Sequence, residues 1–102
     1  MCQGGRKETM VIGAITIKIH ISWSHSLKEK RMVVKSICAK VHNKFNVSIA
    51  EIDDQDLHQI IVLGISYVTT DKAQADSIAD HVINFIESST EGIIVSIDRE
   101  II

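Results

Sequence analysis

Six of the eleven lysine and arginine residues of this chain fall within residues 27–44, together with a single acidic residue, Glu29. The six are Lys28, Lys30, Arg31, Lys35, Lys40 and Lys44. Basic side chains gathered on one element can neutralise nucleic-acid phosphates, so this segment favours contact with a polyanion. On a helical wheel, Lys28, Arg31 and Lys35 share a flank with His42, whereas Lys30, Lys40 and Lys44 lie on the other side. The alternative is a solvated helix face whose lysines pair with nearby acids.

His25 stands just before this basic segment and is the histidine with a candidate role. Its imidazole could meet a partner's phosphate or form a hydrogen bond within its own loop, and both interpretations stay open. The five histidines form no H-x-x-x-H or H-E-x-x-H pair and no C-x-x-C motif accompanies them, so we expect no metal and no cofactor. An enzymatic or small-ligand role would require the fold to bring His25 close to Glu51 or Asp56.

A cluster of carboxylates follows the basic segment, formed by Glu51, Asp53, Asp54 and Asp56. Carboxylate oxygens in a short loop can bind a hard cation. Their spacing does not match the calcium-loop pattern, which needs a glycine at its sixth position and a glutamate at its twelfth. We therefore expect a solvated acidic connection that pairs electrostatically with the basic helix, within one subunit or between two.

Nucleophile and phosphate-binding signatures are missing, because the chain has no G-x-S-x-G, no P-loop and no G-x-G-x-x-G. A triad assembled in space is not excluded by spacing, yet a binding role is favoured over a catalytic one. The net charge of −2 argues neither for nor against a polyanionic partner, since a local patch is hidden in the sum.

The sequence contains no segment that would direct it to a membrane or to secretion. No apolar run reaches the roughly 18 residues needed to span a membrane, and the N-terminus has no signal-peptide core. Two cysteines, Cys2 and Cys38, fit a reduced chain better than a disulfide-stapled secreted one. We expect a soluble cytoplasmic protein that has no membrane partner.

The elements that must position these groups alternate between strand and helix patterns. Alternation over residues 11–21 predicts a strand, and Ser26 with Glu29 forms a capping box that starts a helix at Leu27. Further patterns predict strands at 47–49, 57–69 and 93–101 and a second helix from Thr70 or Asp71 to about Ser88. The order βαββαβ predicts an α+β, ferredoxin-like fold in which both helices cover one face of a four-stranded antiparallel sheet.

Two further expectations concern the chain's organisation. Residues 1–9 contain adjacent glycines and no periodicity, so we expect a flexible N-terminal extension, followed by a single domain over residues 10–102. Trp23 is expected at the edge of the core rather than as a binding hot spot, an interpretation that an exposed ring would reverse.

The sheet face away from the helices is predicted to carry small and mixed side chains and no aromatic ring. Its central positions are Thr16, Lys18, His20, Val62, Gly64 and Ser66. RRM-type domains stack RNA bases on aromatic rings at this place, so that mode of binding is disfavoured. The same face suits pairing with another sheet or protein surface, and a homodimer is therefore an alternative.

Several blocks of this sequence resemble the small bacterial YlxP-like family, also described as domain-of-unknown-function family 503. The blocks span His25–Arg31, Phe45–Glu51, Asp54–Leu57, Leu63–Gly64 and Asn84–Glu87. The chain departs from the family at His58, where a tryptophan is common, and at Trp23-Ser24, where small or proline-containing loops are common. The resemblance implies a ferredoxin-like domain without an established activity and a link to translation or ribosome maturation.

These observations lead to two hypotheses about function. The first is a non-catalytic cytoplasmic accessory protein that contacts RNA or a ribosomal particle, and no DNA, through His25, Lys28, Lys30, Arg31, Lys35 and Lys44. The second is a homodimeric protein-interaction module without nucleic-acid binding.

Overall fold

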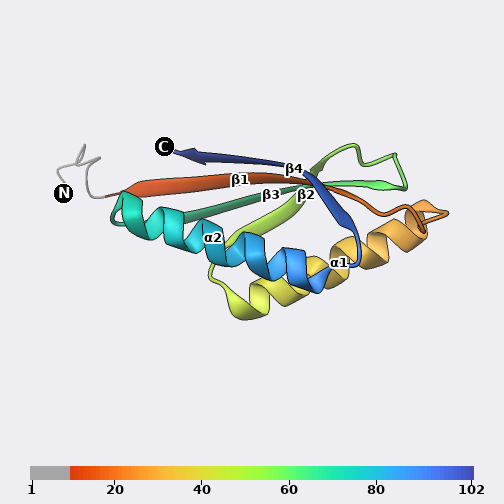
Figure 1. Ribbon diagram of the computed structural model, residues 1–102, viewed down its shortest axis with the longest axis horizontal. Helices are drawn as coiled ribbons and strands as arrows, with labels where there is room; N and C mark the ends of the chain where they lie inside the picture. The colour runs from red at the N-terminus through yellow and green to blue at the C-terminus, as the bar shows by residue number, and fades with distance from the viewer. Residues whose placement is uncertain (1–9) are drawn as a thin grey trace.

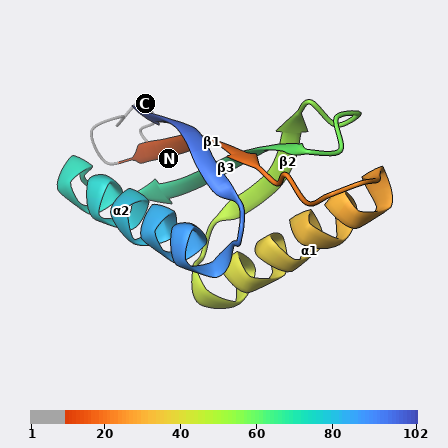
Figure 2. The same cartoon turned by 45° about the vertical axis from the view of Figure 1, so that its right-hand side comes forward.

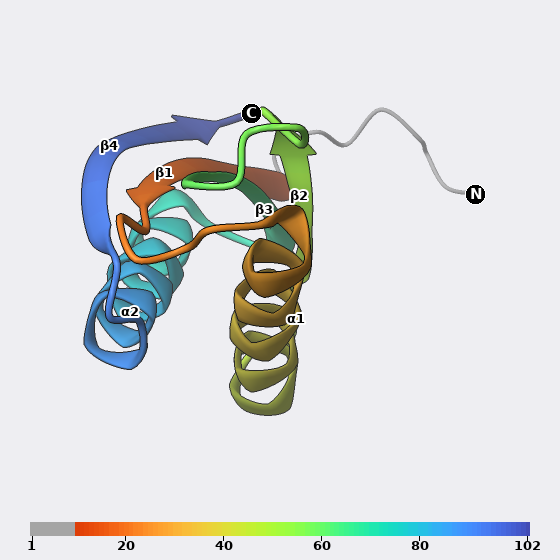
Figure 3. The same ribbon diagram turned by 90° about the vertical axis from the view of Figure 1, so that its right-hand side faces the viewer.

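The computed structural model describes residues 10–102, and the expected extension at residues 1–9 lies outside the described part. Its elements are β1 (Val11–His20), α1 (Leu27–Lys44), β2 (Ser48–Asp53), β3 (Ile60–Thr69), α2 (Lys72–Ser89) and β4 (Ile93–Ile101). The four strands form one antiparallel sheet in the order β2-β3-β1-β4. Both helices lie on the same face of this sheet, α1 below its β2 side and α2 below its β4 side (Figures 1 and 3). The predicted ferredoxin-like fold is confirmed.

The core lies between the sheet and the helices and is built from alternate residues of the two central strands. Ile15, Ile17 and Ile19 of β1 are at most 1% exposed, and the residues between them are only partly covered. This two-residue period is what the sequence pattern predicted, because successive strand side chains point to opposite faces. From β3, Ile61 and Leu63 add fully buried side chains opposite them.

Both helices begin where their capping residues predicted. The Ser26 hydroxyl accepts a hydrogen bond from the Glu29 backbone N–H at 3.1 Å, and the Asp71 carboxylate accepts one from the Gln74 N–H at 2.7 Å. The Glu29 carboxylate accepts from the backbone N–H of His25 rather than from that of Ser26. The cap therefore ties the preceding loop, as well as the first turn, to the helix.

Two strand boundaries differ from the sequence expectation. β2 continues through Glu51 to Asp53, and Glu51 pairs with Leu63 in the sheet instead of starting a loop. β3 begins at Ile60, because residues 57–59 form a turn. The backbone carbonyl of Leu57 points inward to a side chain of α1, and this contact draws the turn out of the β-ladder.

Gly13 in β1 is required by a close approach across the sheet. A Cβ atom placed there would lie 2.2 Å from the Tyr67 ring carbon Cζ, so any larger residue would displace the ring. The Tyr67 hydroxyl donates a hydrogen bond to the Ala75 carbonyl at 2.7 Å, which joins β3 to the first turn of α2. Gly13 therefore makes room for a contact that holds the two layers together.

Helices α1 and α2 diverge as they run under the sheet (Figure 2). In the described part of the chain, neither helix is long and apolar enough to cross a membrane.

Candidate nucleic-acid interface

Three basic side chains form a row on the solvent side of α1. Lys28, Arg31 and Lys35 are all exposed and are spaced three and four residues apart, which places them on one helix face. We call these three residues the basic stripe. Among residues 10–102 none of them has an acidic partner within ion-pair distance. The stripe thus presents three cationic groups whose charges are not neutralised by the described part of the molecule.

Two other predicted residues flank the stripe without joining it. His25 is exposed in the loop before α1, at the end of the helix that carries Lys28. Lys44 is exposed in the last turn, where its Nζ lies 5.3 Å from the centre of the Phe85 ring of α2. Phe85 also packs edge-on against Phe45, with ring centres 5.6 Å apart. Lys44 therefore has a cation–π contact between the helices and faces away from the stripe.

Lys30 does not lie on this surface. The prediction that it contacts phosphates was wrong. Its side chain is fully buried, and its Nζ donates hydrogen bonds at 2.7 Å to the backbone carbonyls of Asp54 and Leu57. The Glu51 carboxylate oxygen Oε2 lies 2.7 Å from the same Nζ. That oxygen has no well-directed hydrogen bond, so the contact with Glu51 is chiefly a charge pair. Lys30 is a core residue with no access to a partner's phosphate.

The spacing of the apolar residues of α1 already indicated that Lys30 would be buried. Lys30, Val34, Ile37 and Val41 are four, three and four residues apart, the spacing of one buried helix face. A lysine at such a position needs buried acceptors, and here the loop between β2 and β3 provides them from 24 to 27 residues away.

The acidic connection is shaped by this buried ammonium. Asp54, whose carbonyl binds Lys30, has a left-handed backbone φ of 51°, an uncommon conformation for a residue with a side chain. Its carboxylate lies 3.9 Å from Lys18 Nζ of β1. The expected pairing between the acidic connection and the basic helix is thus present within one chain, through Glu51 and Lys30.

The remaining groups that could do chemistry are separated from one another. Within residues 10–102, no three His, Cys, Asp or Glu side chains are grouped closely enough to hold a metal ion. No hydrogen bond in that range joins the His25 ring to Glu51 or Asp56. Burial raises the pKa of the Cys38 thiol, and the negative charge of Glu51 raises it further, so a thiolate is disfavoured there.

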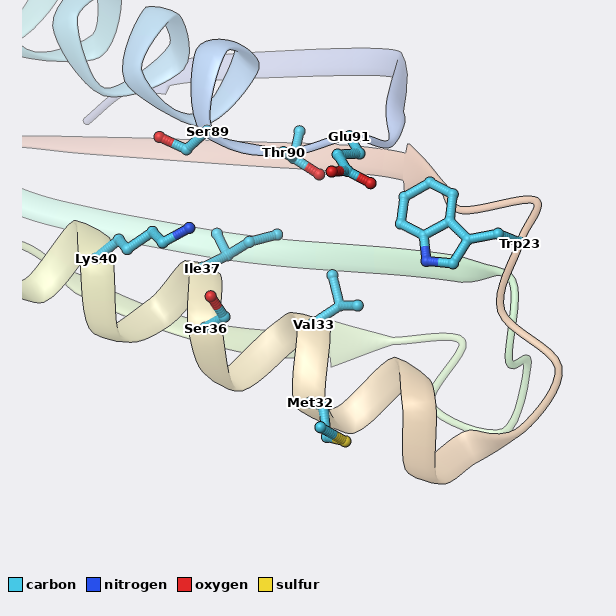
Figure 4. A pocket seen from close by; sticks show the side chains of 9 residues that line it. All are labelled: Trp23, Met32, Val33, Ser36, Ile37, Lys40, Ser89, Thr90 and Glu91. Atoms are coloured by element: carbon cyan, nitrogen blue, oxygen red, sulfur yellow. The ribbon is translucent and has the colours of Figure 1, made fainter.

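A groove lies between α1 and the segment that connects α2 to β4. Figure 4 shows Trp23 at one end and Lys40 at the other, with Val33 and Ile37 of α1 between them. Its volume is about 310 Å³, and Ser89, Thr90 and Glu91 form the opposite wall. Trp23 is 41% exposed, so the expectation that its ring would be anchored in the core edge is reversed. The sequence singled out Trp23 as a residue of interest but did not predict that its side chain is exposed.

The outer face of the sheet carries apolar side chains in contact with solvent. Val68 is 66% exposed and Ile52 is 52% exposed. Around Ile52 lies a depression of about 350 Å³ lined mainly by small residues, namely Ala14, Thr16, Ser48, Ala50, Gly64 and Ser66. No aromatic side chain lines this depression, in agreement with the sequence argument against base stacking on the sheet.

Comparisons with known proteins place the chain in a family and support its fold. It is 47% identical over 66 residues to "Uncharacterized protein YlxP" of Bacillus subtilis (strain 168), covering 65% of this chain and 72% of that protein. The structure is similar to the de novo designed protein Foldit4, with a TM-score of 0.53, 13% identity and coverage of 91% and 96% of the two chains. A second designed protein, LFR1 1 with ferredoxin fold, gives a TM-score of 0.50 at 17% identity, covering 89% of this chain and 83% of the other.

These two structural likenesses concern the fold alone, because their sequence identities are low. The family model for DUF503, described as a protein of unknown function, matches residues 12–99. Nothing in the family description or in the geometry indicates catalysis. The chain belongs to the DUF503 family of proteins of unknown function.

Proposed function

We propose that this protein is a non-catalytic cytoplasmic accessory protein that binds RNA, alone or in a ribosomal particle, through the basic stripe of α1. The observation that supports this function is the exposed, unneutralised row of Lys28, Arg31 and Lys35. A row of cations at three- and four-residue spacing can contact successive phosphates of one strand, and each contact releases a bound counterion. His25 extends this surface at the N-terminal end of the helix. Lys44 lies apart from it and contributes less.

Charge reversal of the stripe is the direct test. We expect Lys28→Glu, Arg31→Glu and Lys35→Glu, combined in one variant, to abolish binding of a single-stranded RNA oligonucleotide in a filter assay at low salt. If the stripe makes three phosphate contacts, the affinity of the unmodified protein should fall about twentyfold between about 50 mM and about 200 mM salt, from a slope of about −0.7 per contact. Co-sedimentation with ribosomes over the same salt series extends the measurement to particles.

A single-residue pair controls for net charge. Lys35→Glu and Lys72→Glu change the charge equally, and both positions are exposed on helices. Only Lys35→Glu should weaken binding and flatten the salt slope, whereas Lys72→Glu should behave as the unmodified protein. Duplex DNA of equal length should compete poorly. Absence of RNA binding at low salt, or binding that survives the triple reversal, would refute the proposal.

A second candidate function is a homodimeric protein-interaction module. The exposed Val68 and Ile52 on the outer face of the sheet favour it, since exposed apolar side chains on one face often mark protein contacts. The two candidates use opposite faces of the molecule, because the stripe lies on the helix layer. They are therefore separable by substitutions on one face at a time.

A further inference from the structure

We propose that the groove between α1 and the α2–β4 connection receives an unpaired base of single-stranded RNA, stacked on the indole of Trp23. This inference rests on the proposed function, because it names the part of a bound RNA that enters the groove. The volume, the polarity and the charges of the groove favour a nucleobase as its occupant.

The groove has the mixed lining that a nucleobase requires. A base has two apolar aromatic faces and a polar edge, and aromatic side chains are the usual platform for those faces. Trp23, Val33 and Ile37 supply apolar surface, while Ser89, Thr90 and Glu91 supply polar groups on the opposite wall (Figure 4). A volume of about 310 Å³ is of the size of a small-molecule site. The Ser89 hydroxyl donates to the Phe85 carbonyl and the Thr90 hydroxyl accepts from the Gly92 N–H, so the charged groups of Glu91 and Lys40 are the main polar contacts that the groove offers.

Trp23 is held outward by a turn that is well anchored on both sides. The Gln59 side-chain amide donates to the carbonyls of Ser22 and Ser24, at 2.9 and 3.2 Å. Ser24 is fully buried, and its backbone N–H donates to the Ile21 carbonyl at 3.1 Å. The residues around Trp23 are thus fixed while its ring stays 41% exposed. Such a preordered ring loses little conformational freedom when a base stacks on it.

Helix α1 carries both the groove wall and the phosphate-binding stripe. Met32 lies at the edge of the groove, four residues after Lys28 and three before Lys35, so it adjoins both on the helix surface. Val33 and Lys40 of the groove lie on the other side of the helix from the stripe, so a strand that contacts both has to cross the outer face of α1 at Met32.

The charges inside the groove determine which part of a nucleotide enters. The Glu91 carboxylate repels a phosphate, but it can accept hydrogen bonds from the amino and imino groups of a base edge. The Lys40 ammonium at the other end can donate to carbonyl or ring-nitrogen acceptors of the base. This arrangement favours the base inside the groove and the phosphates outside on the stripe.

Trp23 is the only tryptophan of the chain, so its fluorescence reports on the groove alone. We expect a single-stranded ten-nucleotide adenine or uracil oligonucleotide to quench this emission with the same midpoint as its binding, measured by anisotropy. Trp23→Ala should weaken that binding about tenfold, within the range measured for one base–aromatic stack, and Trp23→Phe should restore most of it. A duplex RNA of equal length, whose bases are already stacked, should bind both variants equally.

Val68→Ala is the matched control, because it removes an exposed apolar side chain from the opposite face. It should leave both affinity and quenching unchanged, and circular dichroism verifies that every variant is folded. Salt-sensitive oligonucleotide binding without quenching, and undiminished in Trp23→Ala, would overturn the groove proposal and leave the proposed function standing. Quenching by an apolar peptide but not by single-stranded RNA would overturn it as well. If no RNA binds to the unmodified protein, both proposals fail together.

Discussion

Lys30 is the residue whose environment most changes the interpretation of α1. The sequence grouped it with five other basic residues on the surface of the helix, yet its ammonium is enclosed by three backbone carbonyls and the Glu51 carboxylate. A buried charge is tolerated only where oxygens replace its water shell, and the turn at residues 54–57 provides them. The side chain therefore acts as an internal anchor that joins α1 to the loop between β2 and β3.

Removal of this anchor should destabilise the fold strongly. Lys30→Met leaves the Glu51 carboxylate without its charge partner and removes the ammonium from the carbonyls of the turn, and we expect a loss of about 3–5 kcal/mol in the free energy of unfolding by urea. Lys35→Met, an exposed lysine on the same helix, should change it by no more than about 0.5 kcal/mol. Adding Glu51→Leu to Lys30→Met should recover part of the loss, because it removes the unpaired charge. Equal effects of the two single lysine substitutions would contradict the structural role of Lys30.

At the scale of the element, α1 combines three independent surfaces. Its inner side packs Ile37 and Val41 into the core, its outer side carries the basic stripe, and one edge forms the wall of the groove. The buried apolar side chains determine how the helix is rotated on the sheet. The positions of the stripe and of the groove edge then follow from the helical spacing of the sequence. Any RNA-binding function of α1 depends on how firmly its N-terminal end is held, since Lys28 lies in the first turn and His25 in the loop just before it.

The N-cap of α1 can be tested without touching the basic stripe. Ser26→Ala removes the acceptor for the Glu29 backbone N–H and should cost about 1 kcal/mol of stability. Ser36→Ala, in the exposed middle of the same helix, should be neutral or stabilising by up to about 0.5 kcal/mol, because alanine favours helix. Thermal unfolding of the two variants measures the difference. A Ser26→Ala protein as stable as the unmodified one would show that the cap contributes nothing.

At the scale of the whole molecule, the sheet separates two faces whose exposed side chains differ in chemistry. The helix layer carries the cations and the groove, and the outer face carries the exposed Val68 and Ile52. The arrangement βαββαβ determines this separation, because both crossovers place their helices on one side. The two proposed functions therefore use different layers of the molecule.

Oligomeric state decides whether the outer face is an interface between copies. If the second candidate function holds, light scattering at high micromolar concentration should give the mass of a dimer, and Val68→Lys should give that of a monomer by placing a charge in the buried contact. Ser77→Lys, an added lysine on the exposed side of α2, should leave the dimer intact. A monomer at that concentration, unaffected by either substitution, would exclude this face as a dimer interface.

Local patterns in the sequence were sufficient for the elements and for the exposed members of the candidate site. Strand alternation, the Ser26 cap and helical spacing depend on neighbours a few residues away, so β1, α1 and the stripe could be predicted before the fold was known. Two boundaries near residues 51 and 57 were wrong, because they depend on a side chain from another element.

The sequence alone thus determined the order of elements, the ferredoxin-like fold and the side of α1 on which Lys28, Arg31 and Lys35 lie. The tertiary structure decided that Lys30 is buried, that Trp23 is exposed and that α1 faces the α2–β4 connection across a groove. These three features arise from contacts between residues far apart in the chain. A helical wheel describes the direction of a side chain but contains no information about the carbonyls, carboxylates or open space that it meets there.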